Sequence, residues 1–446
     1  MNRFFLLVLG IFLFAVQPVL AAAPGLSVTG AIQEALNNND EIKAASESLA
    51  AGKEEIGVAN SRLLPKVTLE ERALRTNNPG YVFSTKMDQG RFTLQDLQGA
   101  PDTFNQPGLI NDFQTTVSIM QPVVAKEADI GITMARQEYA AQQADFIRKR
   151  EEVAFAVVQA YLSLHTAAEY KTAAETALVD AREHLRIADS RYKAGLGLYS
   201  DMLRASTAVT GAEEKLVSVQ KNLTVAKRQL GLLLGKAEPV EIDGSFPSLP
   251  LRDIGYYTNT AKARADVKAL ELRCENSQNN VNLKAAGNLP TFSVGAGYQM
   301  NDPDKPFGSA GDNWQVMAVL QWNVFDGTRT EHESRKARRQ LEESRIYLDG
   351  LKKKVAFQVY EAFAGVEEAA KNVELAQAAL ASAAEGKRLV EARYQNSLSP
   401  IVDVLDAQLN LDNARAGVVE KENNYRQALT KLSYSSGTLL TDFAIK

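Results

Sequence analysis

Residues 291–300 of this 446-residue chain read TFSVGAGYQM. Because side chains along a β-strand alternate between two faces, one face of this segment carries only apolar groups: Phe292, Val294, Ala296, Tyr298 and Met300. The other face carries small and polar residues: Ser293, Gly295, Gly297 and Gln299. A half-buried soluble sheet alternates in the same way. However, an apolar face with aromatic residues near its ends and a small, polar opposite face are typical of a strand between lipid and water.

Three more segments alternate with period two: residues 67–76, 113–121 and 314–325. Each predicted strand has about 9–11 residues, the length that a tilted strand needs to cross a membrane. Four strands cannot close a barrel, and an open edge in lipid would leave backbone N–H and C=O groups unpaired. We therefore expect several chains to share one barrel. Three chains would give 12 strands, although the residues alone do not choose three.

Two long helical hairpins, residues 128–234 and 330–436, account for most of the remaining chain. The stretch 128–193 contains no proline and only one glycine, so at ~1.5 Å per residue it predicts a helix on the order of 100 Å long. A turn follows at residues 194–197, where Ser200 or Asp201 is expected to cap the returning helix. The second hairpin turns at 396–399 and restarts at Pro400. Helices this long require coiled-coil partners, and their many alanines favour a closed wall of helices.

The second half of the chain repeats the first. Arg191-Tyr192 matches Arg393-Tyr394, and Gly235 matches Gly437, both at an offset of 202 residues. We therefore divide the chain into repeat one (24–235), a linker (236–252) and repeat two (253–446), with a C-terminal tail. An insertion at residues 78–110 joins the two strands of repeat one. It is expected to be an extracellular loop that either narrows the outer mouth or is disordered.

Residues 1–23 have the pattern of a cleaved secretory signal: a positive start, a short apolar run and small residues at Ala21, Ala22 and Ala23. A membrane anchor is the alternative, but the run is short for a bilayer of about 30 Å. No stretch of eighteen or more apolar residues follows. We expect an exported protein.

Composition excludes several function classes. The net charge of −4 argues against nucleic-acid binding. A single cysteine, Cys274, excludes an intramolecular disulfide framework, and three scattered histidines, His165, His184 and His332, do not have metal-ligand spacing. No catalytic constellation or phosphate-binding loop is present, so we predict no enzyme activity, no cofactor and no metal.

The segment Ile401-Val402-Asp403-Val404-Leu405-Asp406-Ala407, preceded by Arg393-Tyr394, resembles the TolC family of outer-membrane efflux channels. The counterpart in repeat one is residues 191–196 with Ser200 and Asp201. This resemblance covers almost the whole mature chain. It implies a trimer with a 12-stranded barrel in the outer membrane, and a periplasmic α-barrel of antiparallel coiled-coil helices. It also implies a passive exit duct of a tripartite efflux or type I secretion system, with a periplasmic adaptor and an inner-membrane pump as partners.

The resemblance also implies a gate at the periplasmic helix ends. Asp403 and Asp406 correspond to a ring of carboxylates at the constriction, although acids near a helix start also simply favour the helix dipole. Tyr394 and Asp201, with Ser200, correspond to a tyrosine–aspartate link of the closed state. Ser399 stands where the family has a basic residue, so the closed state is expected to be held more weakly or differently.

The turns between the long helices are the expected adaptor-docking tips: Gly195, Leu196, Gly197, Ser397 and Leu398. The alternative function is a periplasmic coiled-coil adaptor or scaffold. Two repeated hairpins, each preceded by membrane-like strands, disfavour that alternative. The cargo cannot be read from the sequence.

Overall fold

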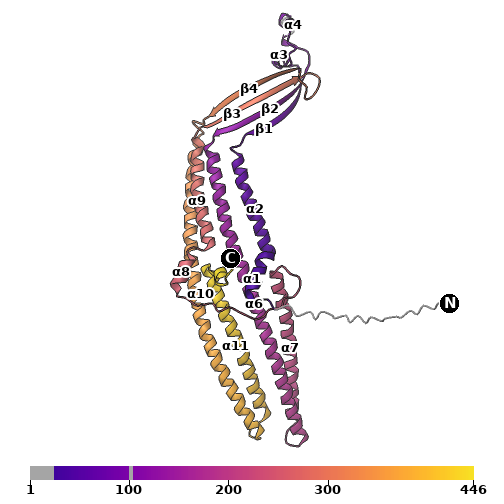
Figure 1. Ribbon diagram of the computed structural model, residues 1–446, viewed down its shortest axis with the longest axis vertical. Helices are drawn as coiled ribbons and strands as arrows, with labels where there is room; N and C mark the ends of the chain where they lie inside the picture. Colours follow the sequence, from indigo (N-terminus) through magenta and orange to yellow (C-terminus); the bar gives the residue numbers. More distant parts are fainter. Residues whose placement is uncertain (1–24, 100–103, 446) are drawn as a thin grey trace, which may run out of the picture.

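The computed structural model describes residues 25–99 and 104–445, so the expected signal segment 1–23 lies outside the described residues. The molecule is long and narrow (Figure 1). A four-stranded sheet lies at one end, long helices run along the body, and two helical hairpins end at the opposite end.

The same order of elements occurs twice. The first half contains α1 (Val28–Asn38), α2 (Asp40–Ser61), β1 (Lys66–Thr76), β2 (Ile110–Val124), α6 (Lys126–Lys193) and α7 (Tyr199–Leu233). The second half contains α8 (Ile254–Ala261), α9 (Ala265–Ala285), β3 (Thr291–Asp302), β4 (Gly311–Gln321), α10 (Arg329–Gln395) and α11 (Ile401–Ser436). Helices α3 (Pro79–Asp88) and α4 (Leu94–Gln98) lie in the insertion, and α12 (Leu439–Asp442) lies in the C-terminal tail.

Some boundaries differ from the sequence expectation. The strand expected at 314–325 runs instead from Gly311 to Gln321, and Trp322 leaves the sheet to donate its indole N–H to the Asn288 carbonyl at 3.0 Å. Helix α7 begins at Tyr199, and Leu198 occupies the N-cap position without a side-chain bond. Ser200 and Asp201 therefore lie inside the first turn and do not cap it.

The sheet is antiparallel throughout, with strand order β1-β2-β3-β4. Residues that pair directly across strands share a face. One face therefore has apolar rows across all four strands: Leu69–Val117–Tyr298–Trp314 and Val67–Ile119–Ala296–Val316. The other face has polar rows: Arg72–Gln114–Asn301–Gly311, Glu70–Thr116–Gln299–Asn313 and Thr68–Ser118–Gly297–Gln315.

The apolar face of the sheet is uncovered in the chain. Trp314 is 74% exposed and Val316 is 73% exposed. A contiguous exposed apolar surface of this kind marks a lipid or protein contact. Strands β1 and β4 are the two edges of the sheet, and neither has a second strand partner in the described chain.

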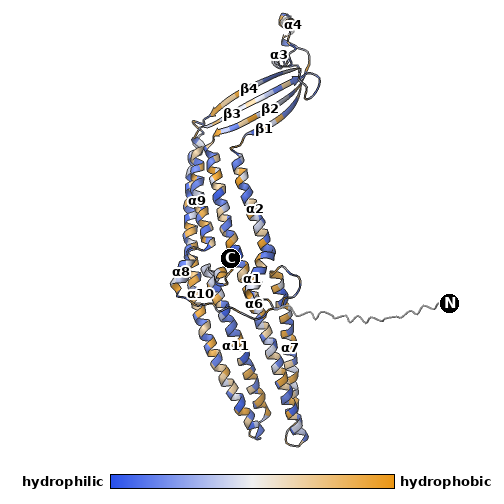
Figure 2. Ribbon diagram, in the orientation of Figure 1, coloured by the Kyte–Doolittle hydropathy of each residue, from blue (hydrophilic) through white to orange (hydrophobic). Residues whose placement is uncertain are grey.

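The two longest helices, α6 and α10, span most of the body. In the half of the body nearest the sheet, each packs against α9, and α6 also packs against α2. In the half nearest the hairpin ends, α6 pairs with α7, and α10 pairs with α11. Hydrophobic and hydrophilic residues are interspersed along these helices (Figure 2). Among the described residues, no helix combines the length and apolar character needed to cross a membrane.

The main hydrophobic core lies at the waist, where α1, α8 and α12 surround the long helices. Tyr161 of α6, Leu230 of α7 and Leu432 of α11 are fully buried in it. The Tyr161 hydroxyl donates to Asp243 Oδ1 at 2.8 Å, which fastens the linker between the repeats onto α6. The two hairpins below the waist are therefore anchored at one end only.

Candidate gate at the helix tips

The turns at the ends of the two hairpins have the same geometry. Gly195 and Ser397, 202 residues apart, both adopt the left-handed conformation, with φ of 73° and 62°. The N–H of Leu196 donates to the Arg191 carbonyl at 2.8 Å, and the N–H of Leu398 donates to the Arg393 carbonyl at 2.8 Å. These bonds close a Schellman-type helix end in each repeat.

Large apolar side chains project from both turns. Leu196 is 73% exposed and Leu398 is 69% exposed, and Leu198 and Tyr199 are also exposed. Helix tips that carry apolar groups into water offer a surface for another protein. The tip residues that the resemblance indicates, which include Gly195, Gly197 and Ser397, therefore lie together at the end of the molecule.

Arg191 at the end of α6 connects the two hairpins. Its guanidinium donates to Ser397 Oγ at 2.8 Å and to the Tyr394 carbonyl at 3.2 Å. The same group lies 4.8 Å from the centroid of the Tyr394 ring, within cation–π distance. We call this set of contacts the Arg191 clasp. Arg191 was noted in the sequence only as part of a repeated motif, and its role was missed.

The expected tyrosine–aspartate pair is close but not hydrogen-bonded. Burial raises the pKa of Tyr394, the nearby Asp201 carboxylate raises it further, and Arg191 opposes the shift. The Tyr394 hydroxyl thus stays protonated and can act as a hydrogen-bond donor. In the described chain no hydrogen bond joins Tyr394 to Asp201. Ser200 is exposed, and the Ser399 hydroxyl is buried without a hydrogen-bond partner among the described residues.

Little apolar surface holds the hairpins together near the tips. Ala188, Ala205 and Ile401 are buried there, with Leu185, Tyr394 and Leu405 packed around them. This cluster is far smaller than the core at the waist. Segments with few buried apolar contacts open at the lowest free energy. By this measure the tips open more easily than the waist.

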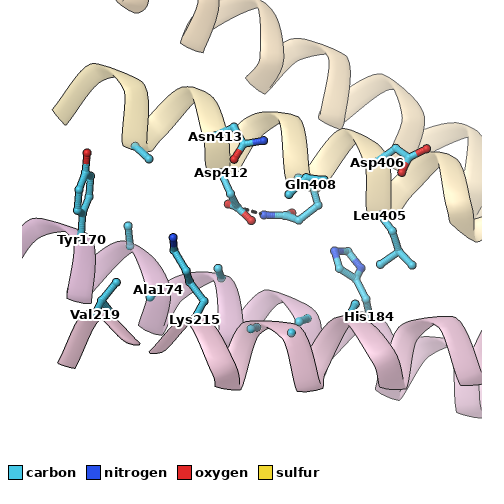
Figure 3. Close-up of a pocket in the computed structure, with 18 residues that line it drawn as sticks. Tyr170, Ala174, His184, Lys215, Val219, Leu405, Asp406, Gln408, Asp412 and Asn413 are labelled. Atoms are coloured by element: carbon cyan, nitrogen blue, oxygen red, sulfur yellow. Dashed lines mark hydrogen bonds between the residues drawn. The ribbon is translucent and has the colours of Figure 1, made fainter. Parts of the chain in front are cut away.

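A second polar bridge lies farther up the seam between the hairpins. The Gln408 amide of α11 donates to Asp180 Oδ2 of α6 at 3.1 Å. It also donates to Asp412 Oδ1 at 2.9 Å (Figure 3). Burial raises the pKa of Asp412; the Gln408 bond and Arg415 lower it, and Asp180 raises it. Gln408 Oε1 is buried and has no partner in the described part of the chain.

The Gln408 bridge borders a cavity of about 710 Å³ between α6, α7 and α11. Eight of its 18 lining residues are alanine or glycine, and seven carry polar groups (Figure 3): Tyr170, His184, Lys215, Asp406, Gln408, Asp412 and Asn413. His184 Nε2 is buried and has no hydrogen-bond partner among the residues that the structure describes. Within residues 25–99 and 104–445, no group of three or more His, Cys, Asp or Glu side chains could hold a metal ion.

Asp403 and Asp406 lie near the start of α11 and are both exposed in the single chain. On the same helix, Ile401 and Val404 are buried against the neighbouring helices. The two carboxylates thus lie on a different side of α11 from its buried stripe. Both lie in the first two turns of α11, close to the tips and to the Arg191 clasp.

Comparison with known proteins identifies the family. The model of the outer membrane efflux protein family matches residues 31–236 and 257–438, which include both repeats. The chain belongs to this family. The resemblance to TolC-type channels is therefore confirmed, and so is the duplicated fold of long helices and β-strands. Family membership makes the chain an outer-membrane efflux channel protein whose helical part lies in the periplasm; the members of this family are not enzymes.

Individual relatives agree with this assignment. This efflux protein is 22% identical to the outer membrane efflux protein BepC of Brucella suis, over 94% of this chain and 87% of BepC. It is 20% identical to the proteases secretion protein PrtF of Dickeya chrysanthemi, over 94% of this chain and 89% of PrtF. The structure of VceC from Vibrio cholerae matches with a TM-score of 0.75 and 18% identity, over 92% of this chain and 96% of VceC.

Proposed function

We propose that three copies of this chain form a channel-tunnel, which is the exit duct of a tripartite efflux or type I secretion system. The sheet carries the proposal: it has an uncovered apolar face, a polar opposite face and two unpaired edges. Pairing of β4 of one chain with β1 of the next satisfies both edges. Three copies then give 12 strands with lipid outside and water inside.

The duct continues through the helices. Because α6 has 68 residues, it extends on the order of 100 Å from the sheet to the tips. This length suits a tunnel that crosses the periplasm. The exposed leucines of the tips, Leu196 and Leu398, then meet a periplasmic adaptor protein, which connects the duct to an inner-membrane pump.

The gate is at the tips, and the Arg191 clasp holds its closed state. In the family pattern a basic residue stands at the position of Ser399. Here the cation comes instead from Arg191, on the other hairpin of the same chain, and it bonds Ser397. In a trimer, Asp403 and Asp406 contribute six carboxylates around the axis. Crowded like charges attract cations, so this ring favours cation binding at the constriction.

Conductance in planar bilayers tests the duct and the ring together. The purified chain is expected to form cation-preferring channels that multivalent cations block from the side of the tips. Asp403→Ala with Asp406→Ala should weaken that block, whereas unchanged block would refute the ring. Recovery of the native chain only from the soluble periplasm would contradict the duct itself.

Crosslinking in cells tests the docking surface. Leu196→Asp and Leu398→Asp are expected to reduce capture of the adaptor while leaving the trimer intact. Val217→Asp, an exposed apolar position on α7 away from the tip, is the matched control. The relatives include an efflux protein and a secretion protein, so export of both small compounds and proteins should be measured.

A further inference from the structure

The insertion between β1 and β2 is a folded unit. Asn78 Oδ1 caps α3 by accepting from the N–H of Gly80 at 3.1 Å, and Thr93 and Asp96 form a capping box on α4. The Lys86 ammonium lies 2.6 Å from Asp96 Oδ1 and, with the Thr93 donors, holds the pKa of Asp96 down to about 2. Phe83 packs against Phe92, with ring centroids 4.7 Å apart.

One side of α3 is buried against the end of the sheet farthest from the helices (Figure 1). Val82, Thr85 and Gln89 follow helical spacing and are 5%, 4% and 1% exposed. Two of these three buried groups are polar, so they must find partners on the surface that they cover.

A buried carboxylate of β2 is the partner of Gln89. Asp112 is 2% exposed, and its Oδ1 accepts from the Gln89 amide at 2.9 Å. The Asn301 amide of β3 donates to both Asp112 oxygens at 3.0 Å, and Gln89 also donates to the Asn111 carbonyl at 2.9 Å. A buried carboxylate without such donors would be strongly destabilising. We call Gln89, Asp112 and Asn301 the latch.

The register of the sheet shows which face the latch occupies. Asn301 stands in the row Arg72–Gln114–Asn301–Gly311, on the polar face. At Gly311, in that row, a Cβ atom would lie 2.1 Å from the Asp88 carbonyl oxygen. The C-terminal end of α3 therefore rests directly on the polar face. Two separate contacts, a hydrogen-bond network and a close backbone approach, agree on this placement.

We propose that residues 79–98 form a fixed lid over the outer mouth of the tunnel, which sets the largest molecule that can pass. Asp112, Gln89 and Asn301 are positioning residues that hold the lid. The inference rests on the proposed function, because closure of the sheet into a barrel makes its polar face the tunnel wall. In a trimer three lids then extend inward from the rim.

Access to a thiol below the lid tests this inference. Thr68→Cys places a probe on the polar face of β1, in a Cys274→Ser background that removes the natural cysteine. A small maleimide is applied to the trimer in nanodiscs, and a bulky polyethylene-glycol maleimide is applied to intact cells from outside. Labelling by the bulky reagent is measured with the lid intact and after Gln89→Ala, Asp112→Ala or Gly311→Ala.

We expect the small reagent to label every version. The bulky reagent should label only Gln89→Ala and Asp112→Ala, which break the latch, and Gly311→Ala, which displaces α3 from the sheet; these three are called the latch variants below. Gly297→Ala and Met87→Ala are controls: the first adds a methyl group on the same face with ordinary contacts, and the second removes an exposed side chain of α3. Equal labelling of the parent and the latch variants by the bulky reagent would overturn the lid. Absence of labelling by the small reagent in an assembled trimer would instead refute the tunnel.

Discussion

At the scale of single residues, the Arg191 clasp joins the ends of the two hairpins. The sequence placed a serine at position 399, where the family has a basic side chain, and predicted that the closed state is held differently. The structure shows a guanidinium from position 191 on the facing turn. Its partners lie more than 200 residues away along the chain. Propensity and periodicity describe one helix at a time, so they could not predict this contact.

Removal of the clasp should open the tips. Arg191→Ala eliminates two charge-assisted hydrogen bonds and a cation–π contact at a partly exposed site, which we expect to shift the closed–open balance by about 1–2 kcal/mol. Single-channel conductance should therefore rise, and Arg191→Lys should give an intermediate value because lysine lacks the planar fork. Arg186→Ala, which removes a pair within one helix, should behave as the parent chain. A parental conductance in Arg191→Ala would exclude the clasp.

Acid should favour the closed tips through Asp412. Its pKa is raised by burial in the packed seam, so the packed state binds the proton more tightly than a separated, hydrated state. The stability of the seam therefore rises as the pH falls through this raised pKa, above the ordinary 3.8.

Conductance measured from neutral to mildly acid pH checks this expectation. The conductance of the parent chain should fall on acidification, and that of Asp412→Asn should change less. Because other charged groups of the channel also affect its conductance, the decisive quantity is the difference between the parent chain and Asp412→Asn at each pH. An identical pH profile in both would remove Asp412 from the gate.

At the scale of elements, the type and order of helices and strands followed from the sequence, while several ends did not. The period-two alternation of apolar residues continues through Trp322 and Val324. Strand β4 nevertheless ends at Gln321, because the chain must turn through Gly327 into α10. Ser200 and Asp201 are good capping residues, yet α7 begins one residue earlier at Tyr199. In the insertion, Asn78-Pro79 is a helix-start signal that was present and not used.

The C-terminal end of α11 is fixed by a buried cation. Arg264 donates to the Ser435 carbonyl at 2.9 Å and pairs with Asp266 at 2.7 Å. Arg264→Ala would leave Asp266 and the helix end without these donors, so we expect a loss of about 3 kcal/mol. Chemical denaturation of the detergent-solubilised protein measures this loss. Arg345→Ala, at an exposed pair on α10, should cost less than about 0.5 kcal/mol, and equal losses would contradict the assignment.

At the scale of the whole molecule, the proposed channel makes the chain one sector of a larger assembly. Periodicity predicted strands with one apolar face, and the register shows that these faces align across all four strands. Below the sheet, aromatic side chains such as Phe357 and Tyr360 of α10 also remain exposed, opposite the buried Val355 and Val359. The sequence could not choose the number of copies because the curvature of the wall depends on contacts between chains.

The exposed aromatic pair should lie between neighbouring chains. Phe357→Asp with Tyr360→Asp is expected to weaken the trimer, because it places charge in an apolar contact. Native mass measurements in detergent give the oligomeric state directly. Lys353→Asp, an exposed charge on the same helix, is the control. A stable trimer in the double variant would place these residues on a free surface.

The two edge strands have a genetic consequence. In the proposed trimer β1 of one chain pairs with β4 of the next, so the contact is head-to-tail, and a chain with a defective β4 edge still offers an intact β1 edge. Such a chain would enter a growing ring and stop it. If half of the chains carried the defect, random mixing would leave about one trimer in eight fully intact. Mutations confined to one edge should therefore be dominant over the wild-type allele, whereas mutations that prevent folding altogether should be recessive.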